Sequence, residues 1–393
     1  MGISKDSQKV PILRFKRFTD DWEQRKLINV VDRVTRRNTN LQSKTPLTIS
    51  AQFGLVDQIT YFSKQVASKN MENYFLLYNG DFAYNKSYSK GYPFGAIKRL
   101  DSYDSGALST LYIVFRPTIV DSNFLVHYFE TTKWYAEIIK ISAEGARNHG
   151  LLNITPSDFF DIKLFIPSKS VEQEKIGTLI NYVENTIRLH QRKLDQLNQL
   201  KEALLQQMFP GKGETVPKLR FAGFEGEWEE RKLGDISEMY QPQTITGHDL
   251  TESGYPVFGA NGYIGYFSKY NHKSSQVTIS ARGEGTGTPS YVDGPVWITG
   301  NSMVINVDKN GIDKMFLYTN LLSFSLKKYV TGGAQPQLVR KVLTNVPIKI
   351  PSNEEQNKLG YFFGQLNANI INNKQKVSNL QSLKTVLLQN MFI

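Results

Sequence analysis

"LRFKRFTDDWEQRKL" occupies residues 13–27, and a close copy, "LRFAGFEGEWEERKL", occupies residues 219–233. The two stretches align without gaps, and nine of the fifteen positions are identical, among them Trp22 with Trp228. We call each stretch an opening motif. Its recurrence in mid-chain predicts that the protein contains two copies of one structural plan.

The two copies also end alike. Residues 171–209 align to 354–392 with 14 identities in 39 positions. Apolar residues recur there at steps of three and four, which predicts two long helices with heptad seams over residues 166–210 and 350–393. The predicted seam residues are Ile176, Ile180, Val183, Ile187, Leu194, Leu197 and Leu204 in the first helix, and Leu359, Phe363, Leu366, Ile370, Val377, Leu380 and Leu387 in the second.

An apolar stripe of this length needs a partner, because an isolated helix of this kind is marginal in water. Each helix can pack on its own globular body, or the two can pack on each other. Polar residues interrupt both seams at matching places, His190 with Asn373 and Lys201 with Lys384. Such interruptions commonly fix register and orientation, so they favour pairing of the two helices.

The bodies between these motifs alternate short β-like runs with Gly- and Asn-rich turns, and helical pieces are expected near 121–141 and 311–329. We therefore predict an α+β protein in which two mixed α/β globular domains are separated by two long antiparallel coiled-coil helices, with a pseudo-twofold internal repeat. The predicted segments are a first domain with its opening motif, a first helix, a second domain with the repeated motif and a second helix, at residues 1–165, 166–210, 211–349 and 350–393.

Composition excludes several classes of protein. The chain has 393 residues, a formal net charge of +11 and no cysteine, so disulfides and cysteine-ligated zinc are excluded. No run of 18 apolar residues and no secretory leader is present, so we expect a cytoplasmic protein that does not enter a membrane. The basic excess is spread thinly, as expected of a folded protein that contacts a polyanion along an extended surface.

Motifs for catalysis are missing. "GEGTGT" at 283–288 resembles a glycine-rich nucleotide loop, but the sequence runs on into turn and strand instead of opening a helix. "GKG" at 211–213 lacks the spacing of a phosphate-binding loop. The five histidines are scattered, so no metal site is expected. An Asp-x-Lys in "SDFFDIK" at 157–163 has no counterpart in the second copy and is interpreted as structural. We predict no catalytic residue and no metal, which leaves binding as the function.

The motifs themselves carry a resemblance. Two unlike bodies, each preceded by "LRF…F…WE-x-RKL" and followed by "IPS…EQ…G…LLQ-x-MF", resemble the specificity (S) subunit of type I restriction–modification systems over essentially the whole chain. The resemblance implies that each body is a target-recognition domain that reads one half of a bipartite site in double-stranded DNA. It also implies that the helix pair sets the half-site spacing and docks two methyltransferase (M) subunits, and that restriction (R) subunits complete the complex. S-adenosylmethionine, ATP and Mg²⁺ would then bind to the partner subunits and not to this chain.

Candidate DNA-binding residues are polar, basic and aromatic side chains in loops after strands, because these can reach phosphates and base edges. In the first body they are Ser50, Gln52, Tyr84, Asn85, Lys86, Ser87, Lys98, Arg99, Arg147, Asn148 and His149. In the second body they are Asn261, Tyr263, Arg282, Glu284, Thr286, Thr288, Asn301, Gln335 and Gln337. Lys86 and Arg282 are interpreted as equivalent, because each follows a strand-like run.

Other residues of the motifs are assigned to packing or docking. The aromatic residues Phe15, Trp22, Phe221 and Trp228 are expected to pack each body against the helices. Further apolar residues lie outside the seams and are expected to dock a partner: Val171, Leu179, Tyr182, Leu200, Leu205 and Phe209, with Phe362, Ile371, Leu383, Leu388 and Phe392. Two alternatives stay open at this point, an orphan DNA-binding or architectural protein that acts without a methyltransferase, and an enzyme with an unrecognised site.

Overall fold

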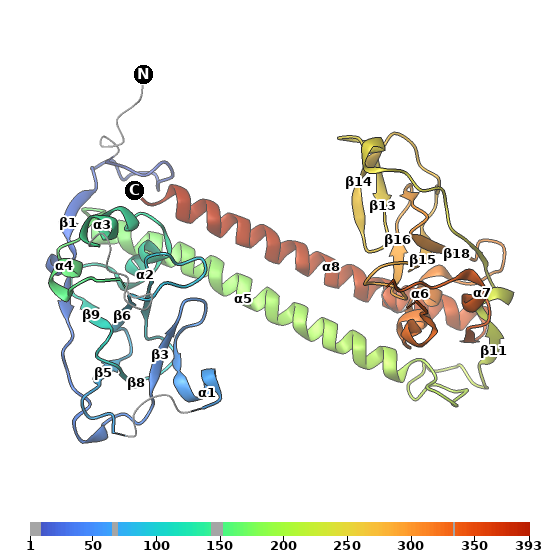
Figure 1. Cartoon of the computed structure of the whole chain (residues 1–393), viewed down its shortest axis with the longest axis horizontal. Helices are drawn as coiled ribbons and strands as arrows, with labels where there is room; N and C mark the ends of the chain where they lie inside the picture. The colour runs from blue at the N-terminus through green and yellow to red at the C-terminus, as the bar shows by residue number, and fades with distance from the viewer. Residues whose placement is uncertain (1–8, 65–69, 143–151, 333–334) are drawn as a thin grey trace. The chain divides into compact units, whose positions relative to one another are not determined.

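The structure is a computed structural model, and it describes residues 9–64, 70–142, 152–332 and 335–393 (Figure 1). It divides into two compact units. The first comprises residues 1–189 with 377–393, and the second comprises residues 190–376. Both long helices, α5 (Ser170–Gln207) and α8 (Asn353–Asn390), cross from one unit into the other. Each unit therefore contains one body and a segment of both helices.

The first body is built on an antiparallel four-stranded sheet in the order β2-β9-β6-β7. Its strands are β2 (Val31–Arg33), β9 (Ile113–Pro117), β6 (Phe82–Asn85) and β7 (Ala96–Arg99). Two further strand pairs complete the body, a hairpin of β3 (Leu47–Ser50) with β4 (Gly54–Asp57) and a pair of β5 (Phe75–Tyr78) with β8 (Ser105–Leu108). The helices of this body are α1 (Gln58–Phe62), α2 (Ser122–Glu130), α3 (Tyr135–Ile141) and α4 (Pro156–Phe160).

The second body repeats this plan. Its four-stranded sheet has the order β12-β18-β15-β16, formed by β12 (Glu238–Tyr240), β18 (Ser302–Asn306), β15 (Gln276–Ser280) and β16 (Pro289–Val292). A three-stranded sheet joins β14 (Tyr263–Phe267), β13 (Tyr255–Phe258) and β17 (Trp297–Ile298). The helices are α6 (Lys314–Leu322), which follows the sheet as α2 does in the first body, and the short α7 (Arg340–Leu343).

The opening motif of each copy ends in a strand that pairs with the last strand of its body. β1 (Glu23–Lys26) pairs antiparallel with β10 (Lys163–Ile166), and β11 (Glu229–Lys232) pairs with β19 (Pro347–Ile350). The register is the same in both copies, because Glu23 lies opposite Ile166 and Glu229 opposite Ile350. The long helices begin three or four residues later.

The motif tryptophans are buried, as the sequence predicts. Trp22 is 3% exposed and makes edge contacts with Phe124 and Phe392, at ring-centroid distances of 5.8 and 6.5 Å. Trp228 is 2% exposed and lies 5.8 Å from Phe209. The matching residues Phe15 and Phe221 pack against the same two cores. In each unit the motif therefore joins the body to the carboxyl end of a long helix.

A buried ion pair fastens each opening motif to the first turn of the helix that follows its body. The guanidinium of Arg14 donates to both carboxylate oxygens of Glu172 at 2.6 and 2.9 Å, and Arg220 donates to Glu355 at 2.8 and 2.8 Å. Both glutamates are 1% exposed. The hydrogen bonds to the carboxylate raise the pKa of each arginine by more than burial lowers it. The pKa of Arg14 and that of Arg220 are therefore raised.

The glycine that both helices share makes a close approach possible. A Cβ on Gly177 would lie 2.8 Å from the Cβ of Asn123, and a Cβ on Gly360 would lie 2.0 Å from Oδ1 of Asp313. Asn123 belongs to the first turn of α2, and Asp313 caps α6 by accepting from the N–H of Phe316 at 2.7 Å. The amino ends of α2 and α6 thus pack directly on the backbone of a long helix.

The predicted seam residues can be followed along both long helices. All fourteen seam residues are buried or half-buried. In the first unit Ile176, Ile180 and Val183 share a core with Leu387 of α8, and in the second unit Leu197 and Leu204 join the core of Phe363. His190 and Asn373 also meet, with 3.1 Å between Nδ1 and Oδ1. The two alternatives for the seams are therefore both realised within each unit, because the helices pack on the body and on each other.

Candidate nucleic-acid interface

Four loops of the second body converge at the end of β15. The N–H of Ala281 donates to the carbonyl of Asn301 at 3.0 Å, and the N–H of Leu338 donates to the carbonyl of Ala281 at 3.0 Å. Arg282 forms an isolated antiparallel bridge with Gln337. These backbone bonds hold the loops after β15, before β18 and before α7 side by side.

The turn between β13 and β14 joins this loop cluster through Asn261. Its Oδ1 accepts from the hydroxyl of Ser280 at 3.4 Å, and it lies 2.1 Å from the position that a Cβ on Gly285 would occupy. Gly285 therefore allows the turn to approach the loop after β15.

Most of the predicted residues of the second body are brought together here with exposed side chains. Tyr263 is 56% exposed. The other exposed members are Asn261, Arg282, Glu284, Thr288, Asn301, Gln335 and Gln337. Guanidinium, amide and hydroxyl groups in one loop cluster form the donor and acceptor set that base edges and phosphates require.

The prediction of Thr286 as a DNA contact is wrong. Its side chain is 5% exposed, and its hydroxyl donates to the carbonyl oxygens of Gly283, at 2.5 Å, and Pro336, at 3.2 Å. Thr286 therefore stabilises the loop from within and cannot present its hydroxyl to a ligand.

The prediction of DNA contacts is also wrong for two residues of the first body. Tyr84 is fully buried on the central strand β6, stacked on Phe159 with 4.8 Å between ring centroids, and its hydroxyl donates to the carbonyl of Phe94 at 2.7 Å. Burial raises the pKa of the Tyr84 hydroxyl well above its usual value. Ser50 is 6% exposed, and its hydroxyl accepts from the N–H of Phe53 at 3.2 Å.

The other predicted residues of the first body do not form one cluster. Asn85 ends β6, Lys86 and Ser87 follow it, and all three are half-buried. Lys86 Nζ donates to the carbonyl of Ile154 at 3.1 Å. Gln52 is exposed at the tip of the β3–β4 hairpin. Arg147, Asn148 and His149 lie outside the described residues.

The side chains of Lys98 and Arg99, on β7, lie against other parts of the first unit. The Arg99 guanidinium donates to Asp101, Ser122 and Asn123 at 2.6–3.0 Å and so ties the strand to the start of α2. Lys98 lines a cavity of about 190 Å³ with Glu130, Trp134 and Lys384, where burial lowers the pKa of its ammonium. Neither side chain has its donors free on the surface as the sequence interpretation supposed.

Lys86 and Arg282 do occupy matching places. β6 and β15 are both third in the sheet order, and Lys86 and Arg282 follow the ends of these strands by one and two residues. The sequence interpretation of the two residues as equivalent is consistent with this topology.

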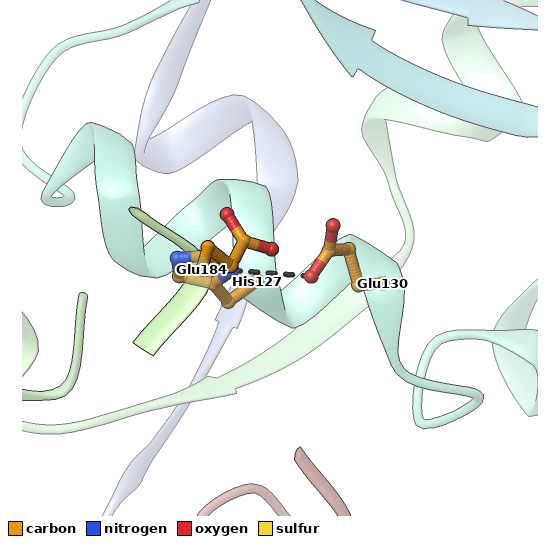
Figure 2. A group of neighbouring side chains, drawn as sticks. All are labelled: His127, Glu130 and Glu184. Atoms are coloured by element: carbon orange, nitrogen blue, oxygen red, sulfur yellow. Dashed lines mark hydrogen bonds and ion pairs between the residues drawn. The ribbon is translucent and has the colours of Figure 1, made fainter. Parts of the chain in front are cut away.

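The first unit holds a cluster of ionisable groups (Figure 2). The scattered positions of the histidines in the sequence gave no indication of it. His127 and Glu130 from α2 lie beside Glu184 from α5, and their ligand-type atoms are all within 4.8 Å of one another. The ring of His127 bonds Glu130 through Nδ1 at 3.1 Å and Asn181 through Nε2 at 2.9 Å. This donor set could hold a divalent cation.

A cation of the chain itself already occupies the carboxylates. The ammonium of Lys384, on α8, bonds Glu130 at 3.1 Å and also pairs with Glu184. Burial alone would raise the pKa of Glu130, but the bonds from His127 and Lys384 outweigh it and hold that pKa at about 2. The same carboxylates raise the pKa of Lys384 against the effect of its burial. The cluster is therefore a charge network that fastens α2 to both long helices.

Replacing Lys384 with Met is expected to lower the free energy of unfolding of the first unit by about 1.5–3 kcal/mol, the cost of losing hydrogen bonds to charged groups. Because the folded-state pKa of Glu130 is depressed, its contribution is present above the unfolded pKa and is lost as pH falls from about 4.5 toward 2. Lys384→Met should therefore flatten this acid limb of stability, measured by thermal melting across that pH range. The control is Lys201→Met at the matching seam position, where the ammonium lies over the Tyr318 ring at 5.8 Å. An equal loss from both variants would contradict the assignment.

The long helices present apolar side chains that neither core covers. Tyr182, Leu200 and Ile371 are 69, 48 and 66% exposed, and Val171 and Leu383 are also exposed. Leu179, Phe362 and Leu388 pack partly against the cores. The prediction is wrong for Leu205, Phe209 and Phe392, which are buried in the cores because the carboxyl ends of both helices insert into the bodies.

Comparison with known proteins finds a family match in the second copy. Residues 225–381 match the type I restriction modification DNA specificity domain. A putative type I specificity subunit S.MpnORF507P of Mycoplasma pneumoniae is 27% identical over 143 residues, a match that covers 35% of this chain and 39% of that relative.

One solved structure shares this fold. The S subunit of a type I restriction-modification system from M. genitalium superposes with a TM-score of 0.69 at 15% identity, covering 98% of this chain and 99% of the other. The HsdS subunit from Thermoanaerobacter tengcongensis gives 0.43 at 17% identity, with 99% of each chain covered.

The resemblance carried by the two motifs is thus confirmed. Residues 225–381 are similar to the type I restriction modification DNA specificity domain, and the chain shares its fold with the S subunit from M. genitalium. Among the described residues, no helix is long and apolar enough to cross a membrane.

Proposed function

We propose that the chain is the DNA-reading specificity subunit of a type I restriction–modification complex. Each body reads one half of a bipartite, asymmetric site in double-stranded DNA. The observation that carries the proposal is the pair of bodies with one sheet order and unlike loops. A repeated scaffold presents two readers, and unlike loops give unlike half-sites.

The long helices have two roles in this proposal. Paired along their seams, they set the separation of the half-sites. Their exposed apolar residues, among them Tyr182 and Ile371, dock two methyltransferase subunits, and restriction subunits join that core. An orphan DNA-binding protein would not need apolar residues outside the seams.

The chain itself carries no chemistry in this proposal. S-adenosylmethionine, ATP and Mg²⁺ are bound by the partner subunits. The test is the methylated motif in the host DNA with and without this chain, together with the proteins that co-purify with it. A motif that vanishes with the chain supports the proposal, and an unchanged methylation pattern with no methyltransferase bound would favour the orphan alternative.

Arg282→Ala is expected to weaken binding to the site by about 1–3 kcal/mol and to relax selectivity at one position of the second half-site. Arg282 is exposed and follows the central strand of the second body, where it can reach a guanine edge. The measurement is binding of the full chain to a set of duplexes that differ by one base pair. Exposed Lys269 of the same body supplies the control Lys269→Ala. An equal loss on every duplex would assign Arg282 to a phosphate.

A further inference from the structure

Both bodies carry a β-hairpin at the same place in the chain order. The β3–β4 hairpin follows β2, and the β13–β14 hairpin follows β12, the first strand of each four-stranded sheet. Neither hairpin belongs to that sheet. Each connects its strands through a short turn, and the two turns contain Gln52 and Asn261.

The first hairpin and the adjoining α1 expose an apolar surface. Phe53, next to Gln52, is 70% exposed, and the neighbouring Ile59, Tyr61 and Phe62 are 44–46% exposed. The Phe53 ring contacts Tyr61 edge-on at 6.4 Å, and Tyr61 contacts Phe62 at 4.9 Å. The bond from the N–H of Phe53 to Ser50 fixes the turn. We call Phe53, Ile59, Tyr61 and Phe62 the first tip.

The second hairpin exposes a comparable surface. Tyr263, Ile264 and Tyr266 are 56, 53 and 46% exposed on β14, an edge strand of its sheet. The Tyr263 ring lies edge-on to Phe258 at 5.3 Å, which holds its position. We call Tyr263, Ile264 and Tyr266 the second tip. Isolated exposed apolar residues need no explanation, but several of them on one short hairpin make it a candidate interaction surface.

The second tip is continuous with the loop cluster that carries the proposed DNA contacts. Asn261, two residues before Tyr263, bonds Ser280 at the end of β15, and Arg282 follows two residues later. The carbonyl of Gly259, on the other side of the turn, accepts from the hydroxyl of Ser302 at 2.9 Å. A ligand bound at this loop cluster would therefore also contact the hairpin.

Each tip also combines two kinds of side chain that suit the edge of a base pair. The amides of Gln52 and Asn261 can donate and accept at an adenine edge. A ring one or two residues away can pack on a thymine methyl group or insert at an easily unstacked base step. A protein partner would be expected to match the apolar area alone, and it would leave the exposed amide of Gln52 without a role.

We propose that the two tips are DNA-reading elements, in which Phe53 and Tyr263 make apolar contacts to base pairs of the first and second half-site, beside the amide contacts of Gln52 and Asn261. This proposal rests on the proposed function and names the residues that read apolar features of the duplex.

The experiment uses the full chain with its co-purifying subunits and the duplex that it selects from a random pool. Phe53→Ala and Tyr263→Ala are compared with Ile119→Ala and Val216→Ala, which remove exposed apolar side chains (60 and 43% exposed) away from the tips. Each tip variant is expected to bind the selected duplex about tenfold more weakly and to lose base preference in one half-site only, with melting temperature unchanged. The control variants should bind like the unaltered chain.

Three results would overturn the inference. The first is unaltered affinity and base preference in both tip variants. The second is loss of subunit co-purification with DNA preference intact, which would assign the tips to a protein partner. The third is loss of preference in both half-sites from one substitution. Selection of no duplex by the unaltered complex is distinguishable from all three, because it would defeat the proposed function itself.

Discussion

If the proposed function holds, exchange of residues 233–349 for the second body of a type I specificity subunit is expected to change one half of the methylated site and to leave the other half unchanged. The second body has its own sheet, and among the described residues its core is made up of members of the second unit. Each mismatched base pair costs about 1–3 kcal/mol, so an original half-site of several base pairs should no longer be methylated. The measurement is the methylated motif in DNA from cells that carry the exchanged chain.

One aromatic contact joins the exchanged segment to a long helix. Phe316, inside the exchanged region, stacks on Phe209 at 6.0 Å, so the donor body must supply an aromatic residue there. The reciprocal exchange of residues 28–165 is the matched experiment and should change the other half-site. A change in both half-sites after either exchange would mean that the bodies do not read independently.

Glu172→Ala is expected to lower the free energy of unfolding of the first unit by about 3–5 kcal/mol, because it leaves the guanidinium of Arg14 buried without its carboxylate. The Arg14 side chain is only 11% exposed, so water cannot replace the lost partner fully. Thermal and urea unfolding measure the loss. Glu355→Ala should give a similar loss in the second unit, because Arg220 is held in the same way.

Two further variants separate the ion pair from other effects of the substitution. Glu174→Ala removes an exposed glutamate from the same helical turn and should cost less than about 0.5 kcal/mol. The double variant Arg14→Leu with Glu172→Leu replaces both charges and should recover most of the stability. A double variant as unstable as Glu172→Ala would show that packing of the helix start, and not the unpaired charge, accounts for the loss.

The sequence predicted the helices and the repeat well, and the reason is local. A heptad pattern depends only on spacing along one helix, so the seam could be listed residue by residue, and every member is at least half-buried. An aromatic residue at the same place in both copies, Trp22 and Trp228, likewise predicted packing. The structural roles of Glu172, Gln173 and Gly177 were visible only as identities between copies, because their partners Arg14, Asp121 and Asn123 lie far away in sequence.

The candidate contacts were predicted less well, because exposure depends on the sheet order. Tyr84 stands in a Tyr- and Ser-rich stretch that is typical of a loop, but β6 lies between β9 and β7, and the ring points into the core. Thr286 belongs to a glycine-rich turn, and its hydroxyl donates to the carbonyl of Gly283 within that turn. Phe53 was not among the contacts predicted from the sequence, because an apolar residue beside a strand-like run is normally assigned to the core.

The central claim is that two unlike bodies on one repeated scaffold read two separate half-sites. Selection of duplexes from a random pool by the full chain with its co-purifying subunits tests it most directly. The account predicts two short specified blocks of different sequence, separated by a gap of constant length and free sequence. A single uninterrupted block, two identical blocks or a gap of variable length would contradict it.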